Sequence, residues 1–91
     1  MELIKLNETY TLIDTTEQWN VSGSVCKEES GLFKITISIA STTGEYLGSF
    51  NYNVNKQGNV NMSFDCNKIY EEVIFKYCNS LVDNILSYFT N

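Results

Sequence analysis

The sequence predicts a two-layer α+β domain in which an antiparallel meander of about five strands packs on one C-terminal α-helix. Three observations predict this fold. Apolar and polar residues alternate through the first two-thirds of the chain, which is typical of strands with one buried face. Polar turns of about four or five residues separate these segments, so consecutive strands must be antiparallel neighbours. From residue 67 the apolar spacing becomes that of a helix.

The length and composition are those of one globular domain. A chain of 91 residues has room for a single core, and one Trp, six Tyr and five Phe supply the bulk to fill it. No repeat, linker or low-complexity segment divides the chain. We therefore expect one domain over residues 1–91.

Five segments have the alternation of strands. In the first, the even-numbered positions are mostly apolar, as at Ile4, Leu6 and Leu12. The third has the clearest pattern, because Ile35 and Ile37 point one way while the polar residues between them point the other. The predicted strands cover about residues 3–13, 18–27, 32–41, 45–54 and 60–65.

The predicted helix covers about residues 67–89. Asp65 or Asn67 can cap its start, and Glu71 and Glu72 lie near the positive end of its dipole. At about 100° per residue its apolar arc spans about 220°, roughly twice what one contact with a sheet needs. Either the sheet or the N-terminal strand covers the surplus, or the surplus is a seam that pairs with a second copy or a partner. The seam would consist of Phe75, Val82, Leu86 and Phe89.

The polar face of the predicted sheet is a second candidate surface. It carries Asn, Ser and Thr almost throughout, whereas solvated faces more often carry Lys, Glu and Thr. Two interpretations stay open: a merely solvated face, or a hydrogen-bonding recognition face. The candidate recognition residues are Asn20, Ser22, Thr36, Asn51 and Asn53.

Charge indicates the class of partner. Eleven acidic residues against six lysines give a net charge of −5, and the chain has no arginine. Direct binding of DNA or RNA needs a basic surface, so we exclude it. An acidic surface can instead dock on the basic cleft of a nucleic-acid-binding protein, or its charged turns can be simply solvated. The candidate acidic turns contain Asp14, Glu17, Glu28, Glu29 and Glu45.

The sequence also argues against an enzyme. Without histidine there is no imidazole base, no His-activated nucleophile and no His metal ligand. Neighbouring acid pairs such as Glu28 and Glu29 diverge on a strand or helix and do not converge on one bond. We expect no cofactor and no metal. The N-terminal segment has charges and no apolar run, so we expect neither a signal peptide nor a membrane span, and a cytoplasmic location.

In size, acidity and self-contained fold, the chain resembles the small acidic inhibitors of phages and mobile elements, the anti-CRISPR proteins among them. The turns at Glu28–Glu29 and Asp14–Glu17 and the absence of arginine carry this resemblance, and the Asn- and Ile-rich, Lys-only composition indicates an AT-rich genome. The resemblance implies a protein that blocks a nucleic-acid cleft or regulatory surface of a host protein in the host cytoplasm. The alternative is a bacterial homodimeric adaptor that self-associates through the helix seam.

Overall fold

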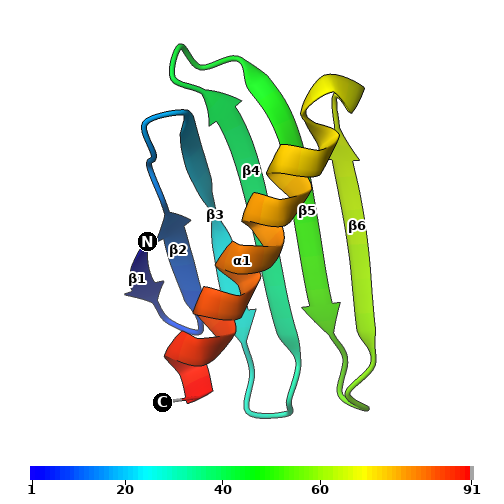
Figure 1. Cartoon of the computed structure of the whole chain (residues 1–91). Helices are drawn as coiled ribbons and strands as arrows, with labels where there is room; N and C mark the ends of the chain where they lie inside the picture. Colours follow the sequence, from blue (N-terminus) through cyan, green and yellow to red (C-terminus); the bar gives the residue numbers. More distant parts are fainter. Residues whose placement is uncertain (91) are drawn as a thin grey trace.

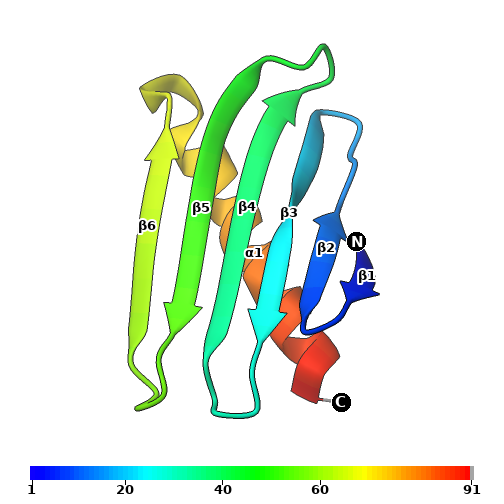
Figure 2. The same ribbon diagram turned by 180° about the vertical axis from the view of Figure 1, so that it is seen from behind.

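A computed structural model describes residues 1–90, which form one antiparallel sheet crossed on one face by a helix (Figures 1 and 2). The expected α+β fold is confirmed, with six strands in place of about five. The strands lie in the sheet in chain order, so every connection is a hairpin. The elements are β1 (Glu2–Leu6), β2 (Thr9–Ile13), β3 (Trp19–Lys27), β4 (Phe33–Ser41), β5 (Tyr46–Val54), β6 (Val60–Cys66), the 3-10 turn η1 (Lys68–Tyr70) and α1 (Glu71–Thr90).

The sixth strand arises because the predicted strand 3–13 is a hairpin. The chain reverses at Asn7 and Glu8, where Asn7 has a positive φ of 61°. Asparagine tolerates this left-handed conformation better than most residues, so a two-residue turn can form there. Leu3 then lies opposite Leu12, on the helix side of the sheet, and Ile4 lies on the other side. The prediction of one continuous strand was wrong.

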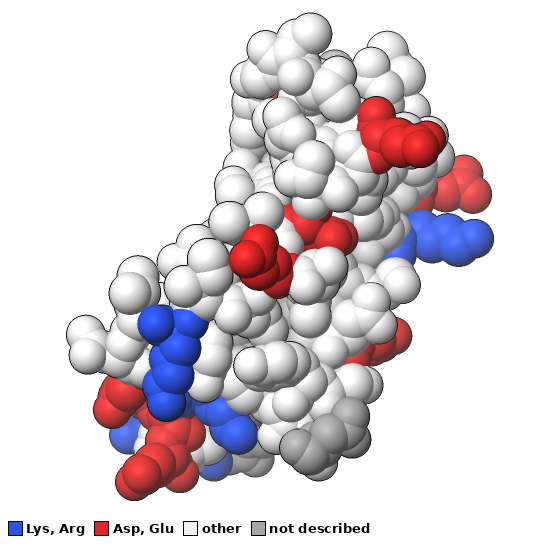
Figure 3. All heavy atoms as spheres, turned by 90° about the vertical axis from the view of Figure 1, so that its left-hand side faces the viewer, with Lys and Arg blue, Asp and Glu red and all other residues white. Residues whose placement is uncertain are grey.

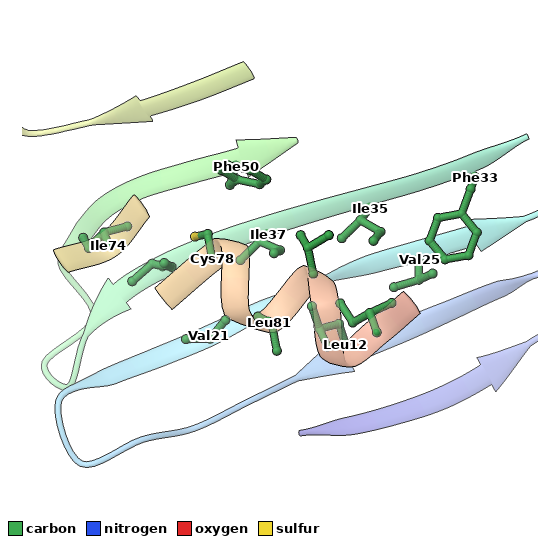
Figure 4. Close-up of a cluster of buried hydrophobic side chains, with 13 residues drawn as sticks. Leu12, Val21, Val25, Phe33, Ile35, Ile37, Phe50, Ile74, Cys78 and Leu81 are labelled. Carbon is green, nitrogen blue, oxygen red and sulfur yellow. The ribbon is translucent and has the colours of Figure 1, made fainter. Parts of the chain in front are cut away.

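The core lies between α1 and the sheet. Figure 1 shows α1 starting at the upper end of β5 and β6 and descending diagonally towards the lower end of β2 and β3. Figure 4 shows the side chains of β3, β4, β5 and α1 that meet between the two layers. Full burial of such side chains stabilises by about 1.5–3 kcal/mol each. The buried residues are Leu12, Val21, Val25, Phe33, Ile35, Ile37, Ile39, Phe50, Ile74, Cys78, Leu81, Val82 and Ile85.

One position in the centre of this face requires glycine. Gly23 of β3 lies between Leu12 and Ile37 on the neighbouring strands. A Cβ atom there would lie 1.9 Å from the carbonyl oxygen of Thr36, a backbone atom that has little freedom to move. Only a residue without a side chain allows β3 and β4 to approach this closely.

The start of the helix follows the sequence prediction. Asn67, one of the two expected caps, accepts a hydrogen bond from the backbone nitrogen of Ile69 at 3.0 Å. Glu71 and Glu72 then occupy the first turn of α1, where the helix dipole favours negative charge. α1 extends to Thr90, within one residue of the expected end. In the part of the chain that the structure describes, no helix has the length and apolar character that spanning a membrane requires.

Candidate protein-binding surfaces

The face of the sheet opposite α1 is open (Figure 2), and most of the side chains directed to it are polar. Strand pairing aligns its side chains into rows that cross the sheet, with neighbours at the strand spacing of about 4.8 Å. Within residues 1–90, the only hydrogen bond between side chains of these rows joins Asn51 to Ser63, at 3.4 Å. The other hydroxyl groups therefore face solvent with free donors and acceptors. One row is Thr11, Ser24, Thr36, Asn51 and Ser63, and the next is Ser22, Ser38, Ser49 and Asp65.

All five predicted recognition residues lie on this open face. Asn20 and Ser22 come from β3, and Thr36 comes from β4. These three side chains are exposed, whereas Asn51 and Asn53 of β5 are half-buried between their neighbours. The structure thus places them on one surface, and their role in recognition stays a prediction.

An apolar strip borders this polar field at the side of β1 and β2. It consists of Ile4, Leu6 and Ile13, which are exposed to 44%, 63% and 37%. Sequence reasoning missed this strip because it treated residues 3–13 as one strand. The signal that could have found it is Asn7, a residue suited to positive φ, in the middle of that segment.

The acidic turns do not form one surface. Asp14, Glu17 and Glu45 belong to loops at the upper end of the sheet in Figure 1, and Glu28 and Glu29 belong to the β3–β4 loop at the lower end. Figure 3 shows acidic and basic side chains crowded together at the lower end, whereas acidic ones predominate above. The lower acids therefore lie among lysines: Lys5, Glu8, Lys27 and Glu29 line one shallow hollow there.

The upper end has the more acidic surface. Asp65, the penultimate residue of β6, lies there and accepts a hydrogen bond from the Tyr46 hydroxyl at 3.2 Å. Glu71 and Glu72 add charge at the start of α1, where Lys68 forms an ion pair with Glu71 at 3.1 Å. Asp65, Glu71 and Glu72 were not among the predicted turn residues, because they lie at the end of β6 and at the start of the helix. We define the acidic end as Glu17, Glu45, Asp65, Glu71 and Glu72.

Asp14 has a structural role. Its carboxylate forms an ion pair with the Met1 amine at 3.0 Å and accepts a hydrogen bond from the Tyr77 hydroxyl of α1. Burial of Asp14 disfavours its charge, but the Tyr77 hydroxyl and the Met1 amine outweigh that effect and lower the pKa of Asp14. Burial and the same carboxylate raise the pKa of Tyr77. Asp14 thus joins α1 to the sheet, and its role in binding a partner stays a prediction.

The predicted helix seam is largely part of the chain's own core. Val82 is 3% exposed, and Leu86 and Phe89 pack half-buried against the core cluster. Phe89 contacts Tyr10 and Phe33 edge-on, with ring centroids 5.0 and 5.4 Å apart. Only Phe75, at 41%, keeps a large exposed surface. Of the two alternatives that the sequence left open, the structure favours cover by the sheet for Val82, Leu86 and Phe89, because the diagonal crossing packs them against it.

Metal-binding side chains and thiols are the remaining chemical groups of the described residues. No group of three or more His, Cys, Asp and Glu residues within 1–90 is placed to hold a metal ion. The three cysteines are free thiols, and burial, with a smaller contribution from Cys66, raises the pKa of Cys78 to about 12. Comparison with protein-family models, curated proteins and solved structures found no match to this chain.

Proposed function

We propose that this chain is a non-catalytic protein-binding module that acts as an inhibitor: its open sheet face docks on a host protein and blocks it. The observation that carries the proposal is the composition of that face. An apolar strip of Ile4, Leu6 and Ile13 adjoins rows of polar side chains, and within the described chain only Asn51 and Ser63 form a hydrogen bond with each other along these rows. Protein interfaces combine an apolar centre with hydrogen-bonding groups in this way.

The acidic end indicates the chemistry of the partner. Glu17, Glu45, Asp65, Glu71 and Glu72 lie at one end of the molecule, with Lys68 beside Glu71. Such a field attracts a basic surface and speeds association with it. We therefore propose that the partner is a nucleic-acid-handling protein in the cytoplasm, and that the chain competes for the site at which this partner binds nucleic acid.

Affinity capture with matched baits tests this proposal. The baits are wild type, Leu6→Lys on the apolar strip and Asn84→Lys on the exposed side of α1. Leu6 is 63% exposed and Asn84 is also exposed, so both variants should fold. We expect a basic protein from a low-GC bacterial lysate to bind wild type and Asn84→Lys alike, and Leu6→Lys at least about tenfold more weakly.

The purified partner then tests the mode of action. Its nucleic acid and this chain should compete for it, and their association should slow as salt rises, because salt screens charges beyond about 8 Å. A partner that binds all three baits equally would contradict the assignment of the face. A partner that holds nucleic acid and this chain at the same time would contradict the inhibitory mechanism.

A further inference from the structure

The two edges of the sheet differ in how well they are protected against pairing. β1 is short, has charges at Glu2 and Lys5, and follows Met1, whose amine forms an ion pair with Asp14. β6 pairs with β5 over seven residues without a register shift, and it contains no proline and no lysine. Natural edge strands that stay unpaired usually carry such protective features. β6 thus has the properties of a strand that pairs.

An apolar shelf lies beside β6 on the helix side of the sheet. α1 crosses diagonally and leaves the lower half of β5 and β6 uncovered (Figure 1). Val60 and Met62 of β6 point to this side and are 51% and 53% exposed, and Tyr52 and Val54 of β5 lie half-buried opposite them. We call these four residues the apolar shelf. Phe64 and Phe75, with ring centroids 5.3 Å apart, form its upper wall.

We propose that β6 pairs with β6 of a second copy of this chain, antiparallel about a two-fold axis at Met62. The two sheets would then form one continuous sheet, with both helices on the same side. In an antiparallel pair, residues that lie opposite each other have their side chains on the same face of the sheet. Two such β6 residues are an even number of positions apart in the sequence, so the two-fold axis passes through the residue midway between them. With Met62 at the axis, Val60 lies opposite Phe64 of the second copy, and the two apolar shelves meet.

The charges of β6 favour a second copy as the occupant. Asp65 is the one charged residue of the strand, and this register places it opposite Asn59 of the other copy, so no like charges face each other. Asn61 lies opposite Ser63, which pairs polar groups on the open face. The strand therefore complements itself in both its apolar and its polar side chains.

The size of the contact sets the expected affinity. In this register residues 60–64 of β6 lie opposite β6 of the second copy, and five residues at about 3.4 Å each give a pairing length of about 17 Å. This is a narrow contact, below the roughly 800 Å² per partner of a standard stable interface, although main-chain hydrogen bonds run along its length. We therefore expect a weak dimer with a Kd on the order of 10–100 μM. The inference is independent of the proposed function, and pairing at β6 leaves the open face free in both copies.

Sedimentation velocity over about 1–500 μM, with two variants, tests the dimer. Met62→Lys puts a charge at the axis and should raise the dimer Kd at least about tenfold while the circular dichroism spectrum stays native. Val73→Lys is the matched control, since Val73 is 56% exposed on the other flank of α1, beside Trp19. It should dimerise like wild type. Because each copy has a net charge of −5, added salt should not weaken the dimer, in contrast to docking on a basic partner.

Hydrogen exchange of the wild type supports the same test without any variant. Backbone amides of β6 should become more protected as the protein concentration rises, and those of β1 should not. A wild type that stays monomeric at about 500 μM would overturn the proposal. This holds even if the monomer binds an extended peptide at β6, because the partner would then not be a second copy. A dimer that Val73→Lys breaks and Met62→Lys leaves intact would overturn it as well.

Discussion

The two faces of the sheet are built from the same kind of strand but end in opposite environments. Ile37 and Thr36 are neighbours in β4, and both are β-branched residues that favour strands. Ile37 is fully buried under α1, whereas Thr36 is exposed on the open face. Residues on both faces thus favour a strand. The face that packs on the helix is the one whose alternate positions carry apolar side chains. Because the Thr36 side chain is exposed, we expect its substitution to affect stability far less than that of Ile37.

The two faces should differ most in the free energy of unfolding that is lost when the same charged residue is introduced on each. Ile37→Asp puts a carboxylate into the core without a partner and should cost more than about 4 kcal/mol, enough to unfold a domain of this size. Thr36→Asp should stay within about 0.5 kcal/mol of wild type. Urea denaturation followed by circular dichroism measures both values. Equal destabilisation by the two changes would mean that the open face is also a packed surface.

A smaller contrast concerns adjacent positions of β3. Gly23→Ala forces a methyl group against the carbonyl oxygen of Thr36 and should destabilise by about 3 kcal/mol, at the upper end for overpacking. Ser24→Ala, one residue further and on the open face, should change the free energy of unfolding by less than about 0.5 kcal/mol. Thermal and urea unfolding compare the two variants. A stable Gly23→Ala would show that β3 and β4 can separate without cost.

The smallest effect comes from the hydrogen bond that joins α1 to the loop after β2. Tyr77→Phe removes the donor to Asp14 and should destabilise by about 1.5 kcal/mol at pH 7. Because the pKa of Asp14 is lowered in the folded protein, the stability that its ionised form contributes is present above the unfolded pKa of about 3.9. It is lost as the pH falls through the folded pKa.

The difference between wild type and Tyr77→Phe should therefore shrink below about pH 3.9. Urea unfolding at pH 7 and at lower pH values measures it. A difference that does not change over this range would mean that the bond does not depend on the charge of Asp14.

Much of the fold can be predicted from the sequence, because the polarity of each side chain indicates whether its position is buried or exposed. The run from Phe33 to Ile39 identifies a strand with one buried face, and Asn67 with Glu71 and Glu72 identifies the start of the helix. The alternation cannot show where a chain reverses within two residues, so the hairpin at Asn7 and the side on which Ile4 and Leu6 lie were missed. The period of two simply continues across such a short turn.

The helix shows a second limit. Periodicity gives the width of its apolar arc but not how much of that arc the sheet covers. The answer depends on the crossing direction and on the twist of the strands, which bury Val82 and leave Phe75 exposed. The polar rows of the open face could be predicted in composition, because the alternating polar positions are visible in the sequence. Their alignment across the sheet required the pairing register.

The central claim is that the open face is the binding surface, and a substitution in the middle of it tests this most directly. The affinity of the purified partner is measured by calorimetry for Thr36→Lys, at the centre of the first polar row, and for Asn84→Lys on the opposite side of the molecule. Both sites are exposed, and both variants gain the same charge. We predict a loss of at least about tenfold in affinity for Thr36→Lys and less than about twofold for Asn84→Lys. Unchanged binding by Thr36→Lys, or an equal loss in both variants, would contradict the account.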